Sequence, residues 1–205
     1  MSNDHGAAAT MRTAGVVLTG GASRRMGRDK ALVEVDGVAM ADRVSDAMRR
    51  CGADPIVLYG GEPAERTALS APNLPDRFPG EGPLGGVLGA MLDLTAPGDP
   101  TGTNDATPIT HALIVACDHA DVDASTLRSL IDEAAGDAVS SVWVAATDRL
   151  HPTCAVWSLA AIDAISAAFA GGERALHRAI RQLRHVAVTV PDRTMANINT
   201  PDDLR

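Results

Sequence analysis

Aromatic side chains are scarce in this sequence, which has two Phe, one Tyr and two Trp among 205 residues. Proteins that bind RNA by stacking its bases need aromatic platforms, so this composition argues against such a function. Basic charge is also lacking, because the formal net charge is −8, whereas nucleic-acid backbones are bound by basic surfaces. No apolar run approaches the roughly 20 residues that span a bilayer. We therefore expect neither a nucleic-acid partner nor a membrane partner.

Cysteine is rare as well, and Cys51, Cys117 and Cys154 form no CxxC pair. An odd number without such a pair argues against a disulfide framework and against a zinc site. Small or apolar neighbours favour buried thiols, and the reducing cytosol is the expected compartment. Residues 1–12 are polar and alanine-rich without an apolar stretch, which is unlike a secretory signal and predicts a disordered leader.

Short β-rich runs alternate with amphipathic segments along the chain. Residues 15–18 and 112–116 are apolar runs that end at polar loops, as buried strands do, whereas residues 38–50 have helical spacing. This alternation implies crossover connections, so we predict one α/β domain with a doubly wound, mainly parallel sheet and helices on both faces. Residues 96–108 are rich in Pro, Gly, Thr, Asn and Asp and predict a flexible surface insertion.

Residues 18–30, with the sequence LTGGASRRMGRDK, form a loop rich in glycine and arginine. Glycines let the backbone approach a ligand closely, and consecutive N–H groups in such a loop can bind an anion. The loop contains four cationic side chains and one acidic side chain, although the chain as a whole is acidic. This local positive charge suits a polyphosphate. The loop matches neither GxxxxGK[ST] nor GxGxxG. From these residues alone it is either a phosphate-binding loop or a solvated basic loop.

The loop resembles the signature of the molybdenum cofactor guanylyltransferases, within the wider NTP-transferase group. Three further motifs are similar to those of the family: GPLGG at 82–86, Cys117-Asp118, and NINTPDDL at 197–204. Together the motifs cover essentially residues 14–205. The resemblance implies a Rossmann-like nucleotidyltransferase domain over residues 13–205. It also implies transfer of GMP from GTP to a molybdenum-pterin cofactor, with release of pyrophosphate.

The resemblance assigns catalytic roles to three residues. Lys30 is expected to contact the transferring phosphate as a point charge, and Arg25 to bind the β- or γ-phosphate. Asp118 is expected to hold Mg²⁺, a hard cation that takes carboxylate and phosphate oxygens. The family usually has proline two residues after this aspartate, whereas this chain has His119-Ala120. We therefore expect a looser turn there and an exposed His119, the alternative being that His119 approaches the metal.

The same resemblance places the nucleotide against one set of residues, namely Leu18, Thr19, Gly20, Gly21, Lys30, Asp76, Gly82 and Asp118. Asp76 would lie near the nucleoside, although Pro75-Asp76 is also an ordinary turn signal. Guanine is favoured by Asp29, because cytidine- and sugar-type relatives commonly have proline before the lysine. Against guanine, relatives often place an asparagine after the second strand, where this chain has Tyr59-Gly60-Gly61.

The pterin acceptor is expected to bind residues of the C-terminal half. Asn197 and Asn199 alternate, so they can point to the same face of an extended segment, and amides suit the mixed donors and acceptors of a pterin. Arg149 and His151 lie in a predicted turn before a strand and resemble a family position that faces the acceptor. The alternative is a structural role for each of these residues.

Three other functions remain open at this point. The chain could form the cytidine dinucleotide of the same cofactor, or transfer a nucleotide to another small phosphate. It could also be a non-catalytic GTP-binding protein that delivers cofactor. The expected partners are GTP and the molybdenum-pterin cofactor, with molybdoenzyme apoproteins or their chaperones as further candidates.

Overall fold

The computed structural model describes residues 11–20, 29–96 and 107–198, and a seven-stranded sheet forms the centre of this part of the chain. From one edge to the other the strands are β5 (Asn73–Leu74), β4 (Ile56–Tyr59), β1 (Thr13–Leu18), β6 (His111–Ala116), β8 (Leu150–Ser158), β7 (Val142–Ala146) and β9 (His185–Thr189). Strand β8 is antiparallel to both of its neighbours, whereas the other pairs are parallel. The predicted α/β fold with a mainly parallel sheet is confirmed.

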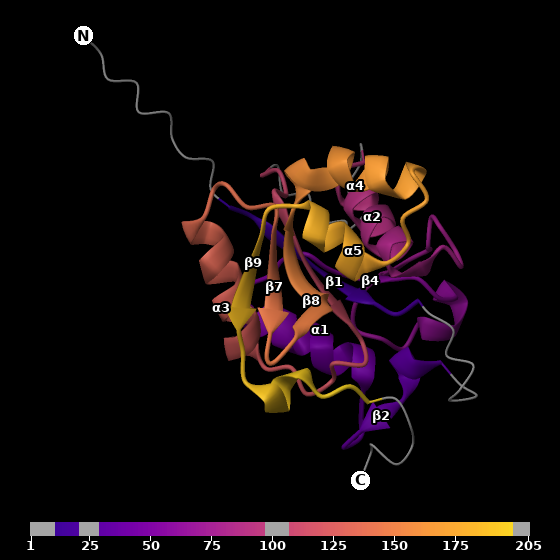
Figure 1. Cartoon of the computed structure of the whole chain (residues 1–205). Coiled ribbons are helices and arrows are strands. Elements are labelled where there is room, and N and C mark those ends of the chain that lie inside the picture. The colour runs from indigo at the N-terminus through magenta and orange to yellow at the C-terminus, as the bar shows by residue number, and fades with distance from the viewer. Residues whose placement is uncertain (1–10, 21–28, 97–106, 199–205) are drawn as a thin grey trace.

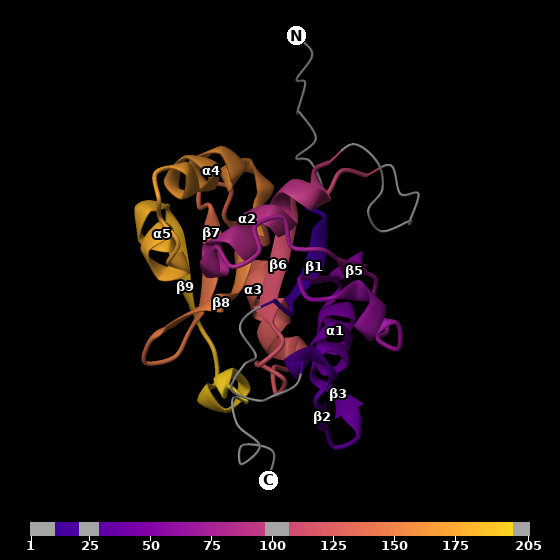
Figure 2. The same ribbon diagram turned by 90° about the vertical axis from the view of Figure 1, so that its right-hand side faces the viewer.

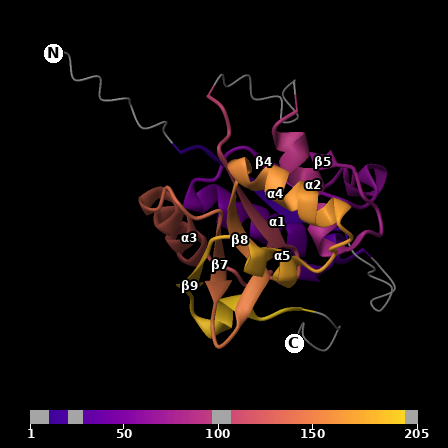
Figure 3. The same ribbon diagram turned by 45° about the horizontal axis from the view of Figure 1, so that its top comes forward.

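Helices cover both faces of the sheet, as predicted (Figure 1). Helices α1 (Met40–Cys51) and α3 (Ala124–Gly136) pack on one face. Helices α2 (Gly82–Leu94), α4 (Ile162–Ala170) and α5 (Leu176–Gln182) pack on the other (Figure 2). Within this second layer α2 and α4 lie side by side (Figure 3). The sheet therefore has two hydrophobic cores, one on each side.

Alternating side chains of the central strands supply both cores. In β1, Val16 packs toward α2 and Val17 packs toward α1, because successive side chains of a strand point to opposite faces. Local signals in the sequence set the helix ends. Asp123 caps α3 by accepting a hydrogen bond from the N–H of Thr126. Gly52 ends α1 with a φ of 91°, a left-handed conformation that favours glycine.

The register of the sheet brings three strand ends to the same edge. Leu18 at the end of β1 pairs with Tyr59 of β4 and with Ala116 of β6. The polar residues that follow these strands therefore emerge next to one another, as expected for ligand sites of parallel sheets. Beyond this edge lie a 3₁₀ helix, Lys30–Leu32, and the small hairpin of β2 (Glu34–Val35) and β3 (Val38–Ala39).

All three cysteines lie in the described part of the chain, and each is a buried free thiol, as predicted. Burial raises the pKa of the Cys117 and Cys154 thiols to about 12. Among the described helices, none is both long enough and apolar enough to cross a membrane. Residues 1–10 of the predicted leader and residues 97–106 of the predicted insertion lie outside the described residues.

Candidate nucleotide-binding site

A cavity of about 470 Å³ opens where the ends of β1, β4 and β6 meet the start of α2. It is lined by Leu18, Gly20, Tyr59, Asp76, Gly80, Gly82, Pro83, Gly86, Ala116, Asp118 and Thr153. Five residues predicted to bind the nucleotide are therefore brought to one cavity from four segments of the chain. Gly21, Arg25 and Asn199 lie outside the described residues.

Lys30 lies beside Asp118 at the rim of this cavity. Its Nζ is 3.8 Å from Asp118 Oδ2 and donates a hydrogen bond to the carbonyl oxygen of Ile198 at 3.1 Å. The N–H of Ile198 in turn donates to the carbonyl oxygen of Asp118 at 2.9 Å. Ile198, which belongs to the described start of the predicted closing motif, thus contacts both residues of the predicted catalytic pair. Lys30 is also the only lysine of the sequence, in which every other basic side chain apart from histidine is arginine.

Asp118 has the features of a magnesium ligand that needs a bound substrate to complete the site. Its Oδ1 is buried and has no hydrogen-bond partner among the described residues. Buried carboxylate oxygens are normally satisfied, so this atom is available to a cation. The described residues contain no cluster of three or more metal-ligating side chains. Such a site suits Mg²⁺, which is held by one or two carboxylates together with phosphates and waters.

The turn after Asp118 is closed by hydrogen bonds, although it lacks the proline of the family pattern. The N–H of His119 donates to the carbonyl oxygen of Ala116 at 3.1 Å, and the N–H of Val122 donates to that of His119 at 3.0 Å. Arg43 of α1 adds a bond from its Nε to the carbonyl oxygen of Ala120 at 3.1 Å. These three bonds connect the turn to β6 and to α1.

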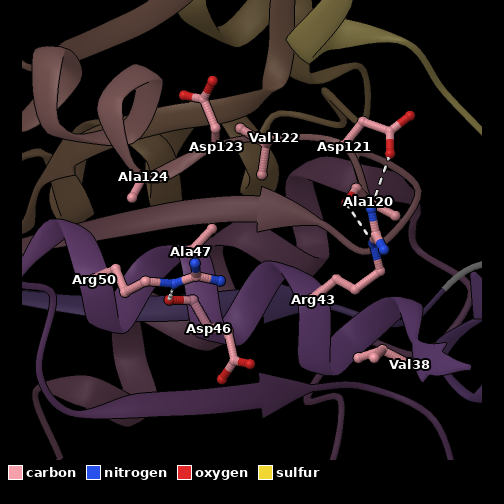
Figure 4. Close-up of a pocket in the computed structure, with 10 residues that line it drawn as sticks. All are labelled: Val38, Arg43, Asp46, Ala47, Arg50, Ala120, Asp121, Val122, Asp123 and Ala124. Carbon is pink, nitrogen blue, oxygen red and sulfur yellow. Dashed lines mark hydrogen bonds and ion pairs between the residues drawn. The ribbon is translucent and has the colours of Figure 1, made fainter. Parts of the chain in front are cut away.

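Figure 4 shows the other side of this turn, where a cavity of about 370 Å³ separates α1 from residues 120–124. Arg43 crosses this space and pairs with Asp121 at 3.2 Å. Arg50 donates to the carbonyl oxygen of Asp46 within α1. The charged groups of this cavity are engaged with the protein itself, so its role is to fix the turn that carries Asp118.

His119 is buried rather than exposed, with 1% of its surface accessible. Its Nε2 lies 3.0 Å from Thr153 Oγ1, and its ring stands edge-on to that of His151. Burial lowers the pKa of His119 to about 4. The expectation failed because its partners come from β8, which lies beside β6 only in the folded sheet. His119 is uncharged at neutral pH and supports the wall of the cavity.

Asp76 and Tyr59 form one part of the cavity wall. Asp76 Oδ1 accepts a hydrogen bond from the N–H of Phe78 at 2.9 Å, which is the turn contact that the sequence also predicted. Tyr59 is buried, and its Oη accepts from the N–H of Arg77 at 3.0 Å. Asp76 thus has both a turn contact and a place on the cavity wall. Tyr59 was not predicted as a site residue.

Asp29 and Arg66 form a buried ion pair next to the site that sequence reasoning missed. Arg66 Nε lies 2.6 Å from Asp29 Oδ2, and Arg66 Nη2 lies 2.8 Å from Asp29 Oδ1. Asp29 also caps the 3₁₀ helix that begins with Lys30, by accepting from the N–H of Ala31 at 3.0 Å. The Asp29 side chain is therefore bound within the protein. Asp29 and Arg66 are 37 positions apart in the sequence, so no pattern of neighbouring residues indicates that they pair.

The residues predicted to bind the acceptor do not line this cavity. Arg149 and Asn197 are exposed, and His151 is buried with its Nε2 2.9 Å from Thr147 Oγ1. His151 belongs to β8 rather than to a turn, because that strand already begins at Leu150. All three are described residues. They line neither the cavity described above nor a second cavity that lies beside it.

That neighbouring cavity also measures about 470 Å³. It is lined by Gly82, Pro83, Pro152, Thr153, Arg174, Ala175, Leu176, His177 and Arg178. Gly82, Pro83 and Thr153 line both cavities. The two cavities therefore share a wall, and two small molecules bound in them would lie close together.

The model of the MobA-like NTP transferase domain matches residues 15–190, which includes the strands and helices around both cavities. The chain belongs to this family. It is a nucleotidyltransferase, and Lys30 and Asp118, which the sequence motifs predicted as catalytic, lie together in its fold.

Relatives of known name resemble the chain over nearly its whole length. The molybdenum cofactor guanylyltransferase of Rhodobacter capsulatus is 37% identical over 201 residues, which cover 95% of this chain and 94% of that protein. The protein of the same name from Rhizobium johnstonii is 34% identical and covers 93% of this chain and 89% of its own length. Family membership therefore rests on whole-length similarity as well as on the domain model.

Solved structures share the fold. Molybdopterin-guanine dinucleotide biosynthesis protein A from Archaeoglobus fulgidus has a TM-score of 0.70 at 22% identity, with 94% of each chain covered. The 2-C-methyl-D-erythritol 4-phosphate cytidylyltransferase from Thermus thermophilus has a TM-score of 0.65 at 17% identity, covering 92% of this chain and 94% of its own. Because both a guanine-type and a cytidine-type protein adopt this fold, the fold leaves the base undetermined.

Proposed function

We propose that this nucleotidyltransferase transfers GMP from GTP to the molybdenum-pterin cofactor and releases pyrophosphate. The observation that carries the proposal is the pair of Lys30 and Asp118 at the mouth of the nucleotide cavity, with Asp118 Oδ1 buried and unpaired. The names of the relatives that resemble the chain over its whole length support guanine and the molybdenum cofactor.

The triphosphate would lie between Lys30 and the start of α2. The ammonium of Lys30 would offset the charge that moves onto the phosphate oxygens during transfer. Helix α2 begins at Gly82 on the cavity wall, and the first turn of this described helix carries no acidic side chain. Its N-terminus therefore adds a partial positive charge toward the phosphates.

Asp118 would hold Mg²⁺ through its unpaired Oδ1 and through Oδ2. A cation held there would supply positive charge that offsets the charge of the phosphates. Asp118 would be oriented for this by its main chain, since its carbonyl oxygen accepts from Ile198 and the following turn is closed by hydrogen bonds. These contacts leave the carboxylate free to face the cavity.

The acceptor would occupy the neighbouring cavity, with its phosphate at the shared wall of Gly82, Pro83 and Thr153. This places the attacking phosphate next to the α-phosphate of the nucleotide, as in-line transfer requires. Arg149, His151, Asn197 and Asn199 stay predicted acceptor residues, and the three described ones lie outside the lining of this cavity. Molybdoenzyme apoproteins or their chaperones would receive the product.

The proposal is tested by incubating the protein and Mg²⁺ with GTP, CTP, ATP or UTP and the molybdenum-pterin acceptor. We expect pyrophosphate release with GTP and a product whose mass equals acceptor plus GMP. CTP is the informative competitor, because Tyr59-Gly60-Gly61 lacks the amide that often follows the second strand in relatives. Turnover with CTP alone would overturn the choice of guanine. Tight GTP binding without turnover would instead support the non-catalytic delivery protein.

A further inference from the structure

One buried guanidinium joins two segments that form the phosphate end of the site. Arg66 is 4% exposed and lies at the end of the 3₁₀ helix Pro63–Arg66, between β4 and β5. It binds both carboxylate oxygens of Asp29. It also donates from Nη2 to the carbonyl oxygen of Thr19 at 3.2 Å, and from Nη1 to the hydroxyl of the same threonine. The end of β1 and the residue before Lys30 are thus held by one side chain.

The remaining donors of Arg66 are also engaged. Nη1 donates to the carbonyl oxygen of Gly60 at 2.5 Å and to Asn73 Oδ1 at 3.2 Å. All three nitrogens of the guanidinium therefore bind acceptors of the protein, and six acceptor atoms surround its five donors. A group saturated in this way cannot read a base or bind a phosphate directly. Its effect on a nucleotide has to pass through the residues that it holds.

The two glycines after β4 make room for two different groups. Gly61 has a φ of 73°, and a Cβ added there would overlap the Nη2 of Arg66. Gly60 has a φ of 90°, and a Cβ there would lie 2.9 Å from the main-chain nitrogen of Gly20. A side chain at position 61 is therefore excluded by the guanidinium, and one at position 60 by the main chain that follows Thr19.

The ion pair also affects the electrostatic potential at Lys30, where the proposed site would hold the phosphates. Asp29 precedes Lys30 directly, and an unpaired carboxylate there would reduce the positive potential at the ammonium. Arg66 neutralises Asp29 in a buried setting where solvent screening is weak. Bidentate geometry in addition fixes the direction in which the chain enters the Lys30–Leu32 helix.

We propose that Arg66 is a positioning residue for nucleotide binding, which sets the place of Lys30 relative to Thr19 and Gly20 through Asp29. The inference rests on the proposed function for the identity of the nucleotide. It predicts that the geometry of the Arg66–Asp29 pair, rather than charge alone, determines affinity for the triphosphate.

The test compares Arg66→Lys and Asp29→Asn with the unaltered protein. Lysine keeps the charge but loses the bidentate contact, whereas asparagine keeps an oxygen that can cap the helix at Ala31 but loses the ion pair. We expect each variant to raise the Kd of Mg²⁺-GTP by about tenfold or more and to raise the KM for GTP in parallel. The KM for the acceptor should stay unchanged. The double variant should lose less GTP affinity than the two single losses added together, because both substitutions remove the same contact.

Arg49→Lys is the matched control. Arg49 also bridges to the segment that follows Arg66, through bonds to the carbonyl oxygen and hydroxyl of Ser70. It contacts neither Thr19 nor Asp29 in any described bond, so its variant should bind GTP like the unaltered protein. Thermal unfolding of all variants separates a general loss of fold from a local effect. Unchanged GTP affinity in folded Arg66→Lys or Asp29→Asn would overturn the inference.

Binding and transfer are measured separately so that the two proposals can fail separately. If the unaltered protein binds GTP without transferring it, the proposed reaction fails, while the binding data still decide the role of Arg66. If it transfers GMP and Arg66→Lys has normal KM and Kd for GTP, only the role of Arg66 fails. If no nucleotide triphosphate binds at all, both proposals are overturned.

Discussion

The ammonium of Lys30 donates a hydrogen bond to the carbonyl oxygen of Ile198, a residue 168 positions further along the chain. Ile198 also binds the main chain of Asp118. The three residues come from the three motifs that the sequence places near residue 30, near residue 118 and near residue 200. Their meeting point is the entrance of the cavity assigned to the triphosphate, and the predictions below begin there.

Asp118→Asn is expected to lower kcat by about 10²- to 10³-fold, because the amide weakens binding of the cation that offsets phosphate charge. The fold should persist, since the structural bonds of Asp118 are made by its main chain. Pyrophosphate release and thermal unfolding measure the two effects. Asp121→Asn is the control, because Asp121 is three residues away and pairs with Arg43 outside the cavity. Full activity of Asp118→Asn would contradict the assignment.

Acetylation of Lys30 is expected to abolish transfer, and GTP with Mg²⁺ should protect it. Because Lys30 is the only lysine, an amine-selective reagent has one side-chain target in this protein. Peptide mass analysis would follow modification at Lys30 with and without nucleotide. Lys30→Arg supplies the control without a reactive amine, and it should transfer slowly because a planar guanidinium replaces a point charge. Normal turnover by protein fully acetylated at Lys30 would exclude a catalytic role.

His111 is expected to make the protein less stable in mild acid. Burial lowers the pKa of His111 below its ordinary value of 6.5. The unfolded chain therefore binds a proton more readily than the folded one, so the contribution of neutral His111 is fully present above pH 6.5. It is lost as the pH falls through the lowered pKa of the folded state.

The measurement is urea unfolding of the unaltered protein and of His111→Asn from pH 7.5 down to pH 4.5. The difference in unfolding free energy between the two proteins should shift in favour of the variant as the pH decreases. A difference that stays constant over this range would show that the histidine has its ordinary pKa in the folded protein.

Gly89→Ala is expected to destabilise the protein by about 1–3 kcal/mol through overpacking. Gly89 lies in α2, and a Cβ added there would overlap the Oη of buried Tyr59. Moving this hydroxyl would also strain the hydrogen bond that it accepts from the N–H of Arg77. Gly136→Ala in α3 is the comparison, since no described atom lies within 4 Å of its added Cβ. Equal urea midpoints for the two variants would argue against tight packing of Tyr59 on α2.

Features encoded by neighbouring residues could be predicted from the sequence. The apolar runs that end at Leu18 and Ala116 and the helical spacing of residues 38–50 each carry their signal within a few residues. The positions of Lys30 and Asp118 followed from family motifs, and the parallel sheet explains why they meet. The predicted domain boundaries and the predicted roles of Arg25 and Asn199 stay predictions.

Features that depend on distant partners could not be predicted. His119 follows the end of a strand, in a segment whose composition is typical of an exposed turn. In the folded protein, however, β8 covers His119, and Thr153 of that strand hydrogen-bonds to its ring. Arg149, His151 and Asn197 belong to recognisable segments, yet whether a side chain reaches a cavity depends on how these segments pack. The second cavity is lined by the start of α2, by β8 and by residues 174–178, and no motif connects β8 with the last of these segments.

The sequence by itself determined the fold class, the family and the two residues at the centre of the proposed phosphate site, because each has a local or motif-length signal. Tertiary structure alone decided that Asp29 is held by Arg66, that Gly61 makes room for this guanidinium, and that Ile198 joins Lys30 to Asp118. The physical reason is that hydrogen bonds and ion pairs act over about 3 Å in space, whereas their partners here lie 37 to 168 positions apart in the chain.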